Sequence, residues 1–363
     1  MNPVAAYPSI LSGEVPELPS SPPPPPPEPA PITSKRIAGS DRFSTAVAIA
    51  REGYRGDGTW PGVDSVIIAS GDDRAAADPL SAAGLCWAYD APLMLVSAGS
   101  TPASVKSAVK EIAANNGGRQ VKIYIVGGTV SVPDARYSEL AAAVGPGTLH
   151  KTRIAGSDRY STAAAISATM RAVAAKDSAK AMPTKVLIAN GADDTKFFDA
   201  LALSPIAASK GYPILPVSAS SVPAATRNEL KALKPVEVII GGGPHTVGSS
   251  AKSQLKSITG RSPQQWYGGD RYSTASAIAS NAVSRNFLAD GAVGVAAKLP
   301  DALTGGSMAG KKNGVLLVTD GSSLSAAPGF WISAHTNNIG AAYVFGGTRS
   351  VTPRVKSQID SKL

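Results

Sequence analysis

The chain has 363 residues, of which 43% are hydrophobic, and a formal net charge of +9. This length and apolar content can bury several cores, and the basic excess favours an anionic partner. We expect no nucleic acid, because the basic residues are scattered and no recognition motif is present. No stretch of about 18 apolar residues occurs, so we expect no membrane insertion. Cys86 is the one cysteine, which excludes a disulfide within the chain.

The first 35 residues differ in composition from the rest. An unbroken proline run extends from Pro22 to Pro27, with Pro19, Pro29 and Pro31 beside it. Such a segment favours an extended polyproline II conformation and acts as a spacer. We therefore interpret residues 1–35 as a proline-rich arm or linker.

One phrase occurs three times after the arm. It runs from Arg36 to Thr45, from Arg153 to Thr162 and, in a trimmed form with Tyr267 in place of the leading arginine, from Tyr267 to Thr274. The copies are spaced by about 115 residues, which is a typical domain length. The sequence therefore predicts three similar modules, called here repeats one (36–150), two (151–265) and three (266–363).

The predicted elements of repeat one follow in a regular order. Ser40 or Asp41 caps a helix, residues 63–69 form a strand, and Asp78 with Pro79 begins a helix with Asp78 as the N-cap acceptor. A strand at 92–96, a helix from 101 to about 117, a strand at 121–126 and a helix from about 133 complete the repeat. Gly127-Gly128 follows the last strand.

Repeats two and three show the same order, with expected strands at 186–189, 213–217, 236–240, 315–318 and 343–345. Apolar strands that alternate with helices are typical of a mostly parallel sheet covered on both faces. The predicted fold class is α/β, with one such unit for each repeat.

Residues that could carry catalysis do not form a recognisable set. His150, His245 and His335 fall at different positions in the repeats, and no serine lies in a nucleophile elbow. Repeats one and two contain matching sets of aspartates, which are Asp72, Asp73, Asp78 and Asp193, Asp194, Asp199. We interpret Asp78, Asp199 and the matching Asp301 of repeat three as helix caps rather than metal ligands. We expect no enzyme activity, no metal and no cofactor.

The repeated phrase is the remaining candidate site. Its arginines, Arg42, Arg159 and Arg271, follow an aspartate at a helix start. A guanidinium can donate hydrogen bonds to a carboxylate, a phosphate or a backbone carbonyl. These arginines therefore either link neighbouring modules or contact a ligand directly. The glycine pairs after the strands could in addition leave backbone N–H groups free for an anion.

The phrase, the Asp-Ala-Leu turn and the late glycine pair resemble the cell wall binding repeat 2 family, which occurs as tandem triplets in clostridial S-layer and other Gram-positive surface proteins. The resemblance implies a Rossmann-like or Toprim-like module, three of which pack as a pseudo-threefold trimer within one chain. It also implies that an anionic wall polysaccharide is bound, with a Pro-Ile-Leu-Leu segment involved. That segment corresponds here to Pro92, Leu93, Met94, Leu95, Pro213, Ile214, Leu215, Val315, Leu316 and Leu317.

We therefore expect a non-enzymatic protein that binds an anionic wall polymer through several weak contacts. No leader segment is apparent at the N-terminus. This favours a phage virion protein whose arm, residues 1–35, docks on capsid or tail proteins. The alternatives are an exported cell-surface or S-layer-type protein at the bacterial cell wall and the targeting part of a wall hydrolase.

Overall fold

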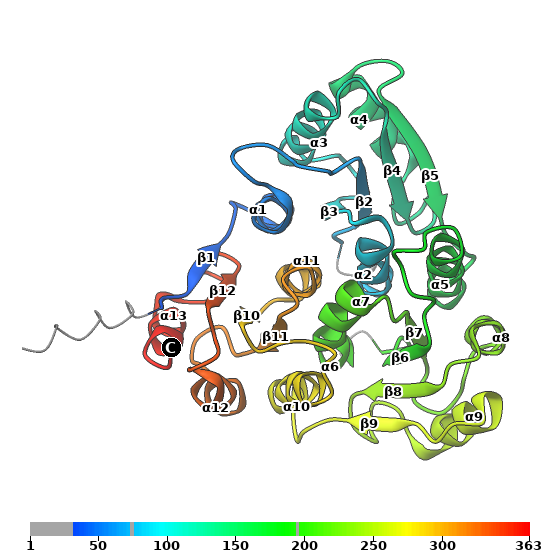
Figure 1. Cartoon of the computed structure of the whole chain (residues 1–363), viewed down its shortest axis with the longest axis vertical. Helices are drawn as coiled ribbons and strands as arrows, with labels where there is room; N and C mark the ends of the chain where they lie inside the picture. Colours follow the sequence, from blue (N-terminus) through cyan, green and yellow to red (C-terminus); the bar gives the residue numbers. More distant parts are fainter. Residues whose placement is uncertain (1–31, 73–75, 194–195) are drawn as a thin grey trace, which may run out of the picture. The chain divides into compact units, whose positions relative to one another are not determined.

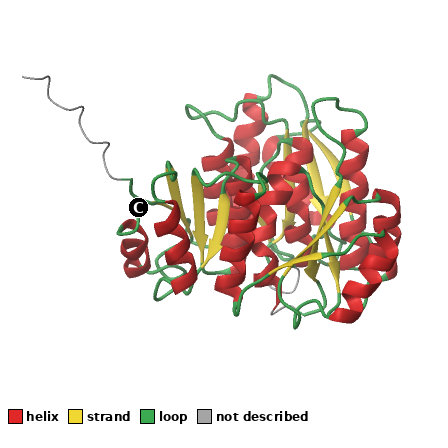
Figure 2. Ribbon diagram, turned by 60° about the horizontal axis from the view of Figure 1, so that its bottom comes forward, coloured by secondary structure: helices red, strands yellow, loops and turns green. Residues whose placement is uncertain are grey.

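The structure is a computed structural model, and it describes residues 32–72, 76–193 and 196–363. Three four-stranded sheets are present in this part of the chain, and every strand pair is parallel (Figures 1 and 2). Their strand orders are β3-β2-β4-β5, β7-β6-β8-β9 and β1-β12-β10-β11. The strands are β1 (Lys35–Ile37), β2 (Ser65–Ser70), β3 (Leu93–Val96), β4 (Val121–Val126), β5 (Leu149–Ile154), β6 (Lys185–Asn190), β7 (Ile214–Val217), β8 (Glu237–Gly241), β9 (Gln264–Trp266), β10 (Ala292–Ala296), β11 (Val315–Val318) and β12 (Ala341–Phe345).

Helices cover the sheets, which confirms the predicted α/β class. Three of them, α2, α7 and α11, pack against one another between the three sheets (Figure 1). The helices are α1 (Arg42–Tyr54), α2 (Ala77–Tyr89), α3 (Ala103–Asn115), α4 (Asp134–Val144), α5 (Arg159–Ala174), α6 (Phe197–Ala200), η3 (Leu201–Leu203), α7 (Ser204–Lys210), α8 (Ala224–Leu233), α9 (Ser249–Thr259), α10 (Arg271–Ser284), α11 (Leu299–Lys311), α12 (Ala326–His335) and α13 (Pro353–Asp360).

The central helices approach closely because small residues lie where they cross. A Cβ atom added to Gly306 of α11 would lie 1.9 Å from the Oγ of Ser204, and one added to Gly310 would lie 2.5 Å from the carbonyl oxygen of Pro205. Neither distance is compatible with a side chain larger than hydrogen. The pseudo-threefold packing of the repeats thus depends on glycine in α11.

Each sheet takes its edge strand from the beginning of a different repeat. Strand β5, at the start of repeat two, pairs with β4, and β9, at the start of repeat three, pairs with β8. Strand β1, which precedes the helix of repeat one, pairs with β12, so that Ile37 lies opposite Phe345. The first strand of the described chain therefore completes the last sheet and closes a ring of three units (Figure 1).

The repeated phrase encodes the start of α1, α5 and α10. Asp41, Asp158 and Asp270 are the N-caps, and each carboxylate accepts a hydrogen bond of 2.7 Å from the backbone N–H of the serine three residues later. That serine hydroxyl in turn accepts from the N-cap backbone N–H, which forms a capping box. The bond from Ser161 lowers the pKa of Asp158. Of the two cap candidates that the sequence offers in repeat one, Asp41 and not Ser40 is the N-cap.

Loss of the N-cap of α10 is expected to destabilise the protein. We expect Asp270→Ala to lower the free energy of unfolding by about 1 kcal/mol, because the backbone N–H of Ser273 in the first turn of α10 loses its acceptor. Urea denaturation measures the change. The matched control is Ser280→Ala, an exposed position on the same helix, where no loss is expected. Equal stabilities of the two variants would contradict the capping role.

The second predicted set of caps is wrong. Asp78, Asp199 and Asp301 are the second or third residues of α2, α6 and α11, and none of these helices has a side-chain hydrogen bond at its N-cap. Their carboxylates still lie in the first turn, where the helix dipole favours negative charge. Asp78 and Asp301 are buried, with 8% and 5% of their surfaces exposed.

Candidate functional site

The carboxylates of Asp78 and Asp301 face the first glycine of a glycine pair. Gly127 and Gly346 have φ angles of +101° and +106°. A Cβ atom added to Gly127 would lie 2.6 Å from Oδ2 of Asp78, and one added to Gly346 would lie 2.3 Å from Oδ2 of Asp301. Both the backbone conformation and the space therefore require glycine here. The glycine pairs and the aspartates, separate motifs in the sequence, form one structural unit.

The residue at the leading position of each phrase lies on the neighbouring strand and donates a hydrogen bond to the first glycine of the pair. Nη1 of Arg36 donates to the carbonyl oxygen of Gly346, and Nη1 of Arg153 donates to that of Gly127, both at 2.7 Å. In repeat three, Nε2 of Gln265 donates to the carbonyl oxygen of Gly242 at 2.9 Å. The assignment of Tyr267 to this position is therefore wrong, because Gln265 takes the place of the arginine.

The central arginines of the phrase have different surroundings. Nη1 of Arg42 donates to the carbonyl oxygen of Gly71 at 2.8 Å, and Nη1 of Arg159 donates to that of Gly191 at 2.7 Å, so each contacts the end of a strand in its own repeat. The guanidinium of Arg271 lies 4.8 Å from the ring centre of Phe198 in α6. Arg271 thus reaches across to repeat two.

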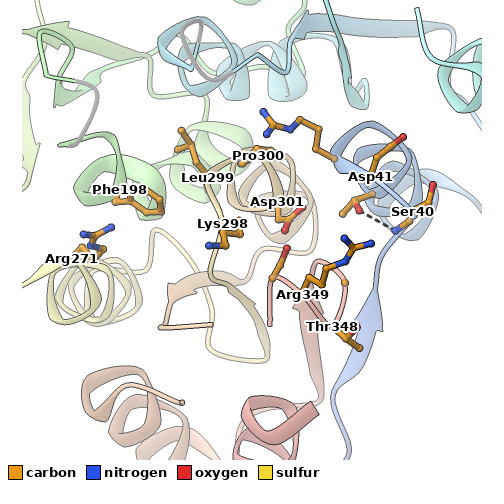
Figure 3. A pocket seen from close by; sticks show the side chains of 15 residues that line it. Ser40, Asp41, Phe198, Arg271, Lys298, Leu299, Pro300, Asp301, Thr348 and Arg349 are labelled. Carbon is orange, nitrogen blue, oxygen red and sulfur yellow. Dashed lines mark hydrogen bonds between the residues drawn. The ribbon is translucent and has the colours of Figure 1, made fainter. Parts of the chain in front are cut away.

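A pocket of about 940 Å³ lies where the first phrase meets repeat three (Figure 3). Its walls come from the starts of α1, α10 and α11, from α6 and from the loop after β12. We call it the basic pocket, because the part of its lining that the structure describes contains four basic and two acidic side chains: Arg42, Arg271, Lys298, Arg349, Asp41 and Asp301. Figure 3 shows Lys298 and Arg349 on opposite sides of Asp301.

Three of these cations are available to a ligand. Arg271, Lys298 and Arg349 are exposed, and no carboxylate within residues 32–72, 76–193 and 196–363 lies close enough to form an ion pair with them. Burial raises the pKa of Asp301, while the Ser350 hydroxyl and the charges of Arg42 and Lys298 act in the opposite direction. The pocket therefore carries an excess of positive charge.

A second pocket, of about 630 Å³, occupies the corresponding place where the second phrase meets repeat one. We call it the acidic pocket, because its described lining contains Asp78 and Asp158 together with one basic side chain, Arg159. Burial raises the pKa of Asp78 to about 6, although the charge of Arg159 lowers it. Val130, in the loop after β4, is 90% exposed at its rim.

The third junction, between the third phrase and repeat two, differs from the other two. The ring of Tyr267 covers Gly243, since an added Cβ atom there would lie 3.1 Å from Cδ2 of the tyrosine. At the matching Gly128, which lines the acidic pocket, nothing lies within 4 Å of such an atom. Tyr267 thus occupies space that is open at the acidic pocket.

The strands implied by the resemblance lie in the interior. Strands β3, β7 and β11 are buried along their whole length, and Pro92 and Pro213 before two of them are buried as well. A polymer cannot reach these side chains in the folded protein. They are Pro92, Leu93, Met94, Leu95, Pro213, Ile214, Leu215, Val315, Leu316 and Leu317.

Other site types find no support in the described residues. No group of three or more His, Cys, Asp or Glu side chains could hold a metal ion within the described ranges, and Asp73 and Asp194 lie outside them. His150 lies on β5, His245 in the loop after β8 and His335 on α12. No helix in this part of the chain has the length and apolar character needed to cross a membrane.

Three α/β units closed into a ring, with polar pockets at two of their junctions, define a modular binding protein. The model of the family "cell wall binding domain 2 (CWB2)" matches residues 36–137, 153–252 and 265–356. The chain belongs to this family, as the resemblance of its motifs predicted.

The chain is similar to several bacterial proteins. The chain is 30% identical over 327 residues to N-acetylmuramoyl-L-alanine amidase LytC of Bacillus subtilis (strain 168) and 26% identical over 333 residues to the amidase enhancer of the same organism, and each match covers 90% of the chain. The solved structures of Cwp6 and Cwp8 from Clostridium difficile match 92% and 91% of it, both with a TM-score of 0.74, at 26% and 21% identity.

The chain spans only part of these relatives, namely 58% of LytC, 41% of the amidase enhancer, 48% of Cwp6 and 52% of Cwp8. All four are bacterial. They favour the bacterial surface protein over the predicted phage virion protein, for which the comparisons give no support. The predicted contact of residues 1–35 with capsid or tail proteins concerns residues of which all but the last four lie outside the described part.

Proposed function

We propose that this chain holds a protein at the bacterial cell wall by binding an anionic wall polymer in the basic pocket. The observation that carries the proposal is the set of three exposed cations, Arg271, Lys298 and Arg349, around one cavity without carboxylate partners in the described chain. Exposed cations gather around a cavity at a cost in mutual repulsion, which an anionic ligand removes. Arg42, which donates to the carbonyl oxygen of Gly71, also lines the pocket from α1.

The polymer would supply the strength that one pocket lacks. A repeating polymer presents many identical anionic groups, so the release of one group is followed by rapid capture of the next. Contacts with exposed cations are individually weak and are screened by salt. We therefore expect wall binding to weaken steadily between low and high ionic strength.

The test is a pull-down with purified Gram-positive walls. We expect the triple variant Arg271→Ala, Lys298→Ala, Arg349→Ala to bind at least about 10-fold more weakly than the wild type at low salt, and to depend less on salt. The matched control removes the same charge from exposed lysines on α3, α8 and α9, namely Lys110, Lys231 and Lys256. If both triple variants lose affinity equally, the basic pocket is not the binding site.

A second candidate function is the targeting part of a wall hydrolase. The match to an amidase over 90% of the chain favours it. In that case the described modules bind the wall and a catalytic domain supplies the cleavage. The test fuses the chain to the part of LytC that the match leaves out and compares this fusion with that part alone on labelled walls. Faster release of soluble fragments by the fusion would support this candidate, whereas equal release would contradict it.

A further inference from the structure

The acidic pocket is lined by Asp78, a largely buried residue whose carboxylate has no hydrogen-bond partner in the described chain. Asp78 is 92% buried, as 8% of its surface is exposed, and it lines the pocket. In repeat two the matching aspartate has a donor, since the Thr246 hydroxyl donates to Oδ2 of Asp199 at 2.5 Å. In repeat three the Ser350 hydroxyl and the charges of Arg42 and Lys298 lower the pKa of Asp301, whereas at Asp78 the charge of Arg159 alone acts in that direction. Among residues 32–72, 76–193 and 196–363, no donor bonds to Asp78.

A buried carboxylate that lacks a donor disfavours the folded state. Such a group is typical of a binding site, where a ligand supplies the missing donor. Gly127 allows this arrangement, because its missing side chain leaves room for Oδ2 of Asp78. The carboxylate therefore fits a role as acceptor for a group that enters the pocket.

The charges around the pocket select the kind of donor. Asp158 adds a second carboxylate, and the single cation, Arg159, donates to the carbonyl oxygen of Gly191 and lies 5.8 Å from the ring centre of Phe197. At the loop position where the basic pocket has Arg349, the acidic pocket has Val130. Among the lining residues that the structure describes, two carboxylates against one engaged cation favour a positively charged ligand group.

We propose that the acidic pocket binds a primary ammonium group carried by the wall polymer. The ammonium donates to Asp78 and Asp158, and the ring of Tyr160, which also lines the pocket, packs against the carrier. Such an ammonium belongs either to an amino sugar without its acetyl group or to an amino-acid ester. The basic pocket would then bind anionic groups of the polymer, and the acidic pocket would bind its ammonium groups. The proposal relies on the proposed function only for the carrier of the ammonium group.

The test uses soluble probes and the full chain, so that its outcome is independent of the wall-binding assay. We titrate isotope-labelled protein with glucosamine, N-acetylglucosamine and D-alanine methyl ester, and follow amide NMR shifts at pH 7.5. We expect the two ammonium compounds, or one of them, to shift signals of residues that line the acidic pocket, and the neutral N-acetylglucosamine to bind at least about 10-fold more weakly. Response to glucosamine alone identifies the amino sugar, and response to the ester alone identifies the amino-acid ester.

Two variants locate the interaction. Asp78→Asn is expected to weaken ammonium binding at least about 10-fold, while Asp301→Asn, the matching change in the basic pocket, leaves it unchanged. The NMR spectrum of each variant reports its fold in the same experiment. Equal binding of glucosamine and N-acetylglucosamine, no shift with either ammonium compound up to about 10 mM, or undiminished binding by Asp78→Asn overturns the proposal.

Discussion

Removal of residues 1–37 is expected to lower the free energy of unfolding of this chain by about 5 kcal/mol. The deletion removes β1, which closes the ring by pairing with β12. It takes away the buried side chain of Ile37, which is 5% exposed, the bond from Arg36 to Gly346, and two bonds of 2.8 and 2.5 Å from Ser34 to Asp360. It also leaves β12 as an unpaired sheet edge, which promotes association between molecules.

The same deletion is expected to reduce wall binding. Strand β1 leads directly into Gly39, Asp41 and Arg42, which line the basic pocket opposite the loop after β12. Arg36 bonds to that loop at Gly346 and so fixes the two walls of the pocket relative to each other. Without β1, the first phrase would no longer be held beside Asp301 and Arg349.

A matched pair of truncations measures both effects. Removal of residues 1–31 keeps every residue that the structure describes, and we expect its stability and wall binding to equal those of the whole chain. Removal of residues 1–37 should shift the urea midpoint strongly and weaken binding in the pull-down. Equal urea midpoints for the two truncations would show that ring closure by β1 adds nothing to stability.

The ring closure illustrates what the sequence could not reveal. Periodicity and the repeated phrase predict three α/β units, because apolar strands and capped helices carry local signals. The segment Lys35–Ile37 is three residues long and contains one apolar side chain, so no periodicity marks it as a strand. Its partner, β12, is about 300 residues away along the chain, and such pairing follows from the packing of the whole ring.

The candidate site was predictable in part. The sequence identified the glycine pairs and the aspartates as repeated features, but not that Gly127 and Asp78 touch, because 49 residues separate them. It marked the third phrase as trimmed, but it did not distinguish the sites of the first two phrases. The two pockets differ at single residues outside the phrase, such as Arg349 in the basic pocket and Val130 in the acidic pocket. These residues lie far from the phrase in the sequence, and the fold brings them to the same pocket.

Replacement of Asp78 by asparagine is expected to stabilise the protein at neutral pH. Burial raises the pKa of Asp78 to about 6, against an ordinary value of 3.8, although Arg159 opposes the shift. A carboxyl whose pKa is higher in the folded state binds protons more tightly there, so its contribution to stability is greatest below pH 4 and is lost as the pH rises to about 6. Above that pH the charged, buried group costs about 2–3 kcal/mol, which the neutral amide avoids.

The comparison of Asp78→Asn with the wild type across pH isolates this effect, since all other groups titrate alike in both proteins. We expect nearly equal free energies of unfolding at pH 4 and a gap in favour of the variant that opens between pH 4 and 6 and then stays constant. Asp301→Asn serves as the control, and its gain should be smaller, because the Ser350 hydroxyl and the charges of Arg42 and Lys298 all oppose the rise in the pKa of that carboxyl. A gain in stability combined with a loss of ammonium binding would mean that Asp78 is retained for its ligand, at the expense of the fold. A variant less stable than the wild type at pH 7 would instead assign Asp78 a structural role.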